Sequence, residues 1–265
     1  MRISLYFEFL KKAFQQKAVY KVNTYLNMFG TLLQLLIQMS LWYALLGSSA
    51  EYNGISFRDM INFVIINTIV STITYCNIGR VLLGKINDGS IANDFIKPLN
   101  LKYYLIFDNL GKNLYDVLFG CLPVCIFSLF ILDFKPPVSL VSFALFLVTI
   151  VNGMILINMI NYILGLLGFW LHATWYLYWY LSALFRLFGG TVVPIWFYPQ
   201  ILADITKYLP FRYISFEPIQ IYLGKLSIYS SFKVILIQIL WILILKALES
   251  FVWDRAVRKV VVFGG

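Results

Sequence analysis

Few residues of this sequence could carry chemistry, and most of them lie inside long apolar stretches. Residues 79–86 read GRVLLGKI, which approaches a phosphate-binding P-loop, but Ile86 stands where that motif needs a Ser or Thr. His172 is the single histidine, so it cannot form a histidine-based metal cluster. The sequence contains neither H-E-x-x-H nor G-x-S-x-G, and no carboxylates are paired in the middle of an apolar stretch. We therefore expect no catalytic centre, metal site or bound cofactor in this chain.

The three cysteines also lie in apolar segments. Cys121 and Cys125 are one helical turn apart, a spacing that a disulfide or a metal ion could use. Small apolar side chains within a helix are the favoured interpretation, for them and for Cys76.

Polar residues within the apolar stretches are the stronger functional candidates. An arginine such as Arg186 costs about 2.5–3.5 kcal/mol at the centre of a membrane helix, so it should face other helices or a wet cavity. Asn67, Ser71 and Thr74 recur at helical spacing, and interhelical hydrogen bonds are common in membrane bundles. Five residues are candidates for a polar path or a subunit interface: Arg186, Asn67, Ser71, Asn158 and Asn161.

The composition indicates the kind of structure that holds these residues in place. Of the residues, 61% are hydrophobic and 12% are charged, against roughly 25% charged in soluble domains. The apolar residues form blocks near the roughly 20 residues that cross a hydrocarbon core. The net charge of +9 comes from basic residues at the ends of these blocks and forms no single patch, so we expect no nucleic-acid partner.

The chain is predicted to be a single all-α membrane domain over residues 1–265. Residues 1–26 form an amphipathic helix on a membrane surface, because apolar residues recur there at helical spacing among lysines. No cleavable signal peptide is expected. Six transmembrane helices should follow, over residues 27–47, 60–83, 114–132, 138–168, 175–197 and 230–250.

The basic residues predict the orientation of these spans. With both termini inside, the inner segments hold fourteen Lys and Arg and the outer segments hold six. Because cytoplasmic loops of membrane proteins are enriched in Lys and Arg, both termini are predicted to be cytoplasmic.

Two long connections lie on opposite sides of the predicted bundle. The inner one, 84–112, includes a short amphipathic helix in region 84–100, with Ile91, Ala92, Phe95 and Ile96 on one face. This helix either floats among the headgroups or docks into a groove of a soluble partner, and its spacing favours neither. The outer one, 199–228, is apolar and broken by prolines, which predicts short re-entrant helices packed on the spans.

These features together resemble the type-2 permease subunits of bacterial ATP-binding cassette (ABC) transporters. The resemblance covers nearly the whole chain and rests on four segments: the amino-terminal helix, INDGSIANDFIKPLN (86–100), VPIWFYPQILADITKYLPF (193–211) and Gly264–Gly265.

The resemblance implies a multi-pass permease of the bacterial plasma membrane that exports a lipid, peptide, polysaccharide or drug-like substrate. The inner helix would be a coupling helix, with Gly89, Ile91, Phe95 and Pro98 as its docking elements. Implied partners are separate ATPase subunits, which bind ATP and Mg²⁺, and a second permease that is identical or homologous. The outer helices would cap the path.

Three other functions stay open at this point. A non-transporting scaffold or immunity protein would need neither a coupling helix nor a path. An ATP-driven importer would use the same parts in the opposite direction. An intramembrane enzyme is disfavoured, because the expected residue sets are missing.

Overall fold

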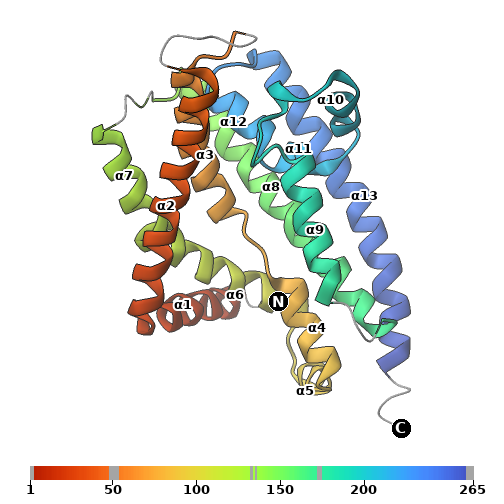
Figure 1. Cartoon of the computed structure of the whole chain (residues 1–265). Coiled ribbons are helices and arrows are strands. Elements are labelled where there is room, and N and C mark those ends of the chain that lie inside the picture. The colour runs from red at the N-terminus through yellow and green to blue at the C-terminus, as the bar shows by residue number, and fades with distance from the viewer. Residues whose placement is uncertain (1–2, 48–53, 132–133, 135, 172–174, 261–265) are drawn as a thin grey trace.

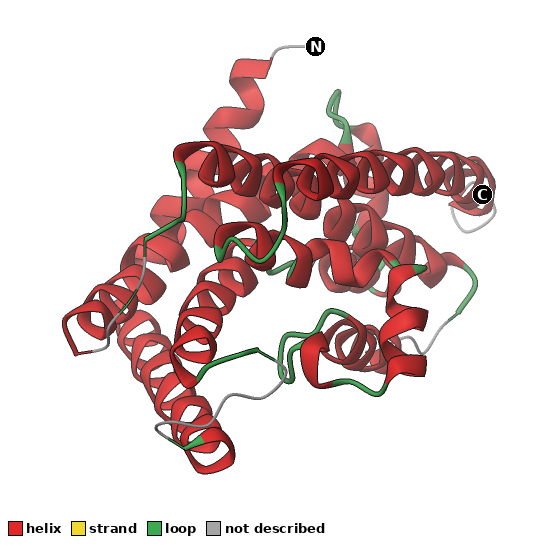
Figure 2. Ribbon diagram, turned by 90° about the horizontal axis from the view of Figure 1, so that it is seen from above, coloured by secondary structure: helices red, strands yellow, loops and turns green. Residues whose placement is uncertain are grey.

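The computed structural model describes residues 3–47, 54–131, 134, 136–171 and 175–260. His172, Gly264 and Gly265 lie outside this part of the chain. Figure 2 shows that the described residues form helices joined by loops. The short helix α5 (Ile91–Ile96) lies at one end of the bundle, and α10 (Gln200–Lys207) lies at the other end (Figure 1).

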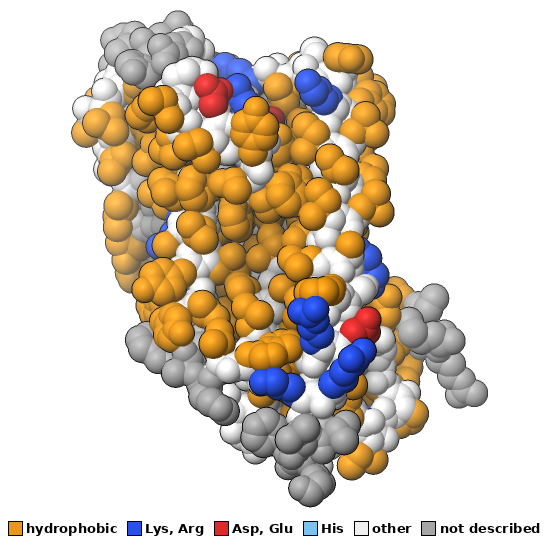
Figure 3. Space-filling model, turned by 90° about the vertical axis from the view of Figure 1, so that its right-hand side faces the viewer, with side chains coloured by type: hydrophobic (Ala, Val, Ile, Leu, Met, Phe, Trp, Pro, Cys, Tyr) orange, Lys and Arg blue, Asp and Glu red, His pale blue; other side chains and the backbone are white. Residues whose placement is uncertain are grey.

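Four helical segments of the described chain are long and apolar enough to cross a membrane. They are Lys21–Leu46 (α2), Phe57–Asn87 (α3 and α4), Leu140–Phe169 (α8 and the 3₁₀ turn after it) and Ile228–Lys259 (in α13). Figure 3 shows apolar side chains across the middle of one face and Lys and Arg mostly toward its two ends. This pattern is that of a membrane-embedded protein.

The other two predicted spans are built differently. The third, 114–132, is part of a longer helical path made of α6 (Leu101–Tyr115), a π-helical segment (Asp116–Cys121) and α7 (Leu122–Ile131). The predicted polar connection up to residue 112 therefore includes most of helix α6, whose apolar residues Leu101 and Leu105 are buried.

The predicted fifth span, 175–197, is also shorter than expected. Helix α9 (Trp175–Phe188) ends at Gly189, and Gly190 then turns the chain with a φ of 64°. A residue with a side chain is strained at this φ, so glycine permits the turn. A short 3₁₀ turn, Ile195–Phe197, follows outside the helix.

The second span, predicted as continuous over 60–83, is broken in its middle. Helix α3 (Phe57–Ile73) ends at Thr74, and α4 (Ile78–Asn87) begins after a non-helical stretch that reaches Asn77. Thr74 is thus the carboxyl-terminal cap of α3 and does not continue the helical spacing of Asn67 and Ser71. The near-match to a P-loop, 79–86, lies within α4.

Helix α8 (Leu140–Leu166) is the centre of the bundle and packs against α4 and α13 (Ile228–Val260). A Cβ atom added to Gly79 would lie 2.3 Å from the Asn161 carbonyl oxygen, and one added to Gly165 would lie 2.9 Å from the Gly79 Cα. Small residues let helix backbones approach this closely in membranes. Elsewhere in the bundle, Cys121 and Cys125 pack in an apolar cluster with their sulfur atoms 3.7 Å apart.

Helix α1 (Ile3–Val19) lies alongside α6 over most of its length, near the lower end of α2 in Figure 1. Tyr6 and Ala13 of its apolar stripe are buried, and Gly111 of α6 would clash with the Leu10 carbonyl oxygen if it carried a Cβ. The Lys17 ammonium also binds the Asp116 carboxylate at 2.6 Å. Apolar residues of α1 that predicted a helix on the membrane surface therefore pack against the rest of the protein.

The outer connection forms three short helices: α10, α11 (Pro210–Ile214) and α12 (Phe216–Tyr222). All seven residues of α12 are buried, and α11 and α12 pack on α8. In contrast, α10 exposes Ile201 and Ile205. The connection is thus a folded cap with one apolar outer surface.

Candidate functional site

The break between α3 and α4 is held open by two asparagines of α6. Asn109 Nδ2 donates to the Tyr75 carbonyl oxygen at 3.0 Å, and Asn113 Nδ2 donates to the Ile73 and Tyr75 carbonyl oxygens at 3.0 and 2.6 Å. Carbonyl groups freed by a helix break must find such partners inside a membrane. The two amides therefore make the break a defined structural element.

The cavity beside this break has a volume of about 500 Å³, within the range of about 300–1,000 Å³ that is typical of small-molecule sites. It lies between α2, α3, α8 and α9. Its polar lining residues are Gln34, Gln38, Asn67, Ser71, Thr74, Tyr75, Asn77, Arg80, Asn161, Tyr178, Ser182, Arg186 and Thr191. Two arginines and no carboxylate lie among the lining residues of the described chain.

Four of the five predicted residues meet in this cavity. Asn67, Ser71, Asn161 and Arg186 line it from three different helices. Asn158 does not line it but accepts a hydrogen bond from the Cys76 Sγ at 3.4 Å, and Cys76 lies in the wall. The sequence thus identified residues that the fold brings together.

Arg186 lies in the last turn of the short helix α9, and not in the middle of a long span as predicted. Its side chain is exposed to the cavity. Because helix carboxyl ends carry partial negative charge, this position is favourable for a cation. Because Arg186 lies at a cavity wall, the free-energy cost of placing its charge in an apolar segment is reduced.

At the other end of the molecule, α5 exposes three residues of the predicted apolar face, Ala92, Phe95 and Ile96, and buries the fourth, Ile91. Ile91 is 5% exposed and packs inside the bundle, and the Phe95 ring contacts the Trp253 ring with centroids 6.1 Å apart. Ile96 is 83% exposed and is the most prominent apolar side chain of the helix. Gly89 turns the chain before α5 with a φ of 74°, and Pro98 is exposed after it.

Asp94 holds α5 against α4. Its carboxylate is buried and accepts hydrogen bonds from Lys85 of α4 at 2.5 Å and from Lys97 at 2.8 Å. Burial raises the pKa of Asp94, but the two lysines outweigh it and hold the pKa below its ordinary value of 3.8. The carboxylate is therefore charged at neutral pH, and it fixes α5 to α4.

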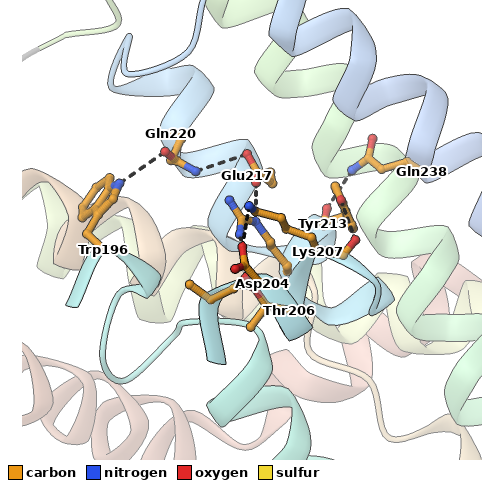
Figure 4. Close-up of polar contacts among 10 residues, drawn as sticks. Trp196, Asp204, Thr206, Lys207, Tyr213, Glu217, Gln220 and Gln238 are labelled. Atoms are coloured by element: carbon orange, nitrogen blue, oxygen red, sulfur yellow. Dashed lines mark hydrogen bonds and ion pairs between the residues drawn. The ribbon is translucent and has the colours of Figure 1, made fainter. Parts of the chain in front are cut away.

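Figure 4 shows a polar network within the cap formed by α10, α11 and α12. The Arg212 guanidinium binds the Glu217 carboxylate and also donates to Thr206 Oγ1 at 3.2 Å. Gln220 donates to Glu217 at 3.2 Å and accepts from the Trp196 indole at 3.3 Å. Each of the three short helices thus contributes to one buried network.

Gln238 joins this cap to the spans. Its side-chain amide donates to the Tyr213 carbonyl oxygen of α11 at 2.8 Å and to the Thr149 carbonyl oxygen of α8 at 2.9 Å. Gln238 itself lies in α13 and is fully buried. A movement of the long helices would therefore reach the cap directly.

Spanning helices, a broken span and a polar cavity within the bundle are features of a membrane transport protein. A family model agrees, since the model of the ABC-2 family transporter proteins matches residues 31–264. The chain belongs to the ABC-2 transporter family and is a transport permease. No sequence among the curated proteins matches it.

Proposed function

We propose that this chain is the membrane-spanning subunit of an ABC exporter and that a separate ATPase drives it. The observation that carries the proposal is the 500 Å³ polar cavity beside the broken second span, in a chain of the ABC-2 family. This family implies association with an ABC ATPase, which would bind ATP and Mg²⁺. The cavity would form part of the path, with Arg186, Asn67, Ser71 and Asn161 in its wall and Asn158 behind them.

The ATPase would dock on α5 at the cytoplasmic surface. Basic residues are enriched at the α5 end of the chain, which supports a cytoplasmic location for both termini. Exposed Ile96 would insert into the ATPase, with Gly89 and Pro98 shaping the turn on either side. Ile91 would support α5 from within because it is buried, and Phe95, which is 36% exposed, would contact both the ATPase and Trp253.

Movement of α5 has two routes into the bundle. The Lys85–Asp94 ion pair links α5 to α4, and the contact between Phe95 and Trp253 links it to α13. Helix α4 is packed closely on α8 through Gly79. The break after Thr74 separates these elements from α3, so the inner half of the molecule could move against the outer half.

The remaining parts fit a dimeric permease with six spans. Helices α7 and α9 would complete the six, α1 would lie at the cytoplasmic surface, and α10–α12 would form the re-entrant outer cap. A second permease, identical or homologous, would face the apolar surfaces of α2 and α9, where Leu36, Ile37 and Leu184 are exposed. Two permeases and two ATPases would then form the transporter.

The test is to purify the tagged chain from its native membrane in mild detergent and identify the proteins that accompany it. We expect an ATP-binding cassette subunit in a fixed ratio and ATP hydrolysis by the preparation. Inverted vesicles containing the complex should take up substrate when ATP is added outside. A preparation without any nucleotide-hydrolysing protein, from cells in which the chain is fully functional, would refute the proposal.

A further inference from the structure

The cavity has a charge that the protein itself does not balance. Arg80 and Arg186 both line it, and neither forms an ion pair with another described residue. Arg80 lies over the Tyr178 ring, with its guanidinium carbon 6.0 Å from the ring centroid. Two guanidinium groups without a carboxylate favour an anionic occupant, because Arg matches the geometry of phosphate and carboxylate oxygens.

Two buried polar atoms at the cavity also have no partner in the described structure. They are the Asn67 Oδ1 and the Tyr178 hydroxyl, on side chains that are 6% and 7% exposed. Asn67 is oriented by its amide nitrogen, which donates to the Thr191 carbonyl oxygen at 2.8 Å. Its oxygen is therefore left to accept a hydrogen bond. Buried polar atoms are normally paired, so these two atoms indicate a ligand or water that the protein alone does not supply.

The rest of the wall is apolar and is bordered by surfaces that suit lipid. Ile157, Leu181, Phe185 and Val192 line the cavity, and α9 exposes Trp179 beside it. An occupant that is anionic at one end and apolar at the other would match both parts of the wall. A hydroxyl or amine on the anionic end would pair with Asn67.

We infer that this cavity binds the head of an anionic amphiphile, in which a phosphate-type anion pairs with the arginines of the wall, Arg80 beside Tyr178 and Arg186 of α9, and a hydrogen-bond donor lies against Asn67. This inference names the substrate class of the proposed path and rests on that proposed function. Phosphate bound to a lipid and phosphate bound to a soluble molecule share the same head chemistry. The apolar wall favours the lipid.

Binding to the purified full-length chain in detergent tests this inference without any ATPase or nucleotide. The probes are short-chain phosphatidylglycerol, which is anionic and carries hydroxyls, short-chain phosphatidylcholine, which is zwitterionic, and glycerol phosphate, which lacks the tails. We expect phosphatidylglycerol to bind at least about tenfold more tightly than either of the others. Equal binding of the two lipids would overturn the anionic preference, and equal binding of glycerol phosphate would overturn the amphiphile.

Variants locate the binding within the molecule. Arg80→Gln and Arg186→Gln should each weaken phosphatidylglycerol binding about tenfold, because each loses a charge-assisted hydrogen bond. Arg255→Gln is the matched control, since Arg255 is exposed on α13 outside the cavity and carries the same charge. Unchanged binding in both cavity variants, or an equal loss in Arg255→Gln, would overturn the inference.

A further variant covers the case in which an arginine is needed for folding. Ser71→Asp adds a carboxylate to the cavity and leaves both arginines in place, so it should also weaken phosphatidylglycerol binding. Unaltered affinity in this variant would contradict the inference. Because these measurements involve no ATPase, their failure would leave the proposed permease function standing, and absence of an ATPase partner would leave the binding result standing.

Discussion

An Ile96→Asp chain is expected to enter the membrane at the normal level and to lose its ATPase. Ile96 is 83% exposed on α5, so a carboxylate there is solvated and should not disturb the fold. In the complex the same carboxylate would be buried in an apolar groove without a partner. Loss of an apolar anchor at an interface typically costs about 2–4 kcal/mol, which weakens binding roughly 30- to 1,000-fold. Co-purification of the ATPase with the tagged chain measures this loss.

Two comparisons separate docking from folding. Ile201→Asp makes the same substitution at a residue that is 79% exposed at the opposite end of the molecule, and it should leave the ATPase bound. Phe95→Asp is less specific, because its ring contacts Trp253 inside the permease. A stable complex with normal ATP turnover in Ile96→Asp would show that α5 is not the docking element.

Replacing Arg212 by Met should produce the largest loss of stability. The Glu217 carboxylate is 5% exposed, and its ion pair with Arg212 is the main compensation for its burial. Breaking a buried ion pair on one side typically costs about 3–5 kcal/mol, because an uncompensated charge is left inside. The midpoint of thermal unfolding in detergent should fall markedly, and the loss should shrink at lower pH, where Glu217 is protonated.

The chain offers two controls for this prediction. The Lys207–Asp204 ion pair also lies in the cap, but both of its side chains are about half exposed. Lys207→Met should therefore lower the free energy of unfolding by no more than about 1 kcal/mol. Adding Glu217→Gln to Arg212→Met removes the unpaired charge and should restore much of the stability. Equal unfolding midpoints for Arg212→Met and Lys207→Met would mean that the cap does not depend on the buried pair.

The sequence predicted the long helices well and the interruptions poorly. Helices α2, α8 and α13 follow from hydropathy alone, because each is a long apolar block. The break after Thr74 could not be predicted from its own residues. It depends on Asn109 and Asn113, which come from another helix, α6, and supply the missing hydrogen bonds. Such tertiary partners are not visible in a local pattern.

The candidate site was predicted in part, for a related reason. Arg186, Asn67, Ser71 and Asn161 stood out because polar residues are costly in apolar segments. Arg80 and Tyr178 were missed, since an arginine near a helix end and a tyrosine within a span are ordinary by type. The burial of Asp94 in α5 was also missed. Amphipathic spacing placed Asp94 off the apolar face, but Lys85 of the preceding helix draws its carboxylate inward.

We expect ATP, acting through a partner ATPase, to open and close the polar cavity. The most direct test uses a chain in which Ser182, an exposed residue of the cavity wall, is replaced by Cys and Cys76 is replaced by Ala. The measured quantity is the rate at which a water-soluble thiol reagent labels the cysteine at position 182. Cys121 and Cys125 are buried, and Ser139→Cys, outside the cavity, is the reference. We predict that the labelling rate at position 182 changes several-fold between the nucleotide-free and ATP-bound complexes, while the rate at position 139 stays constant. Equal rates at position 182 in both states would contradict the account.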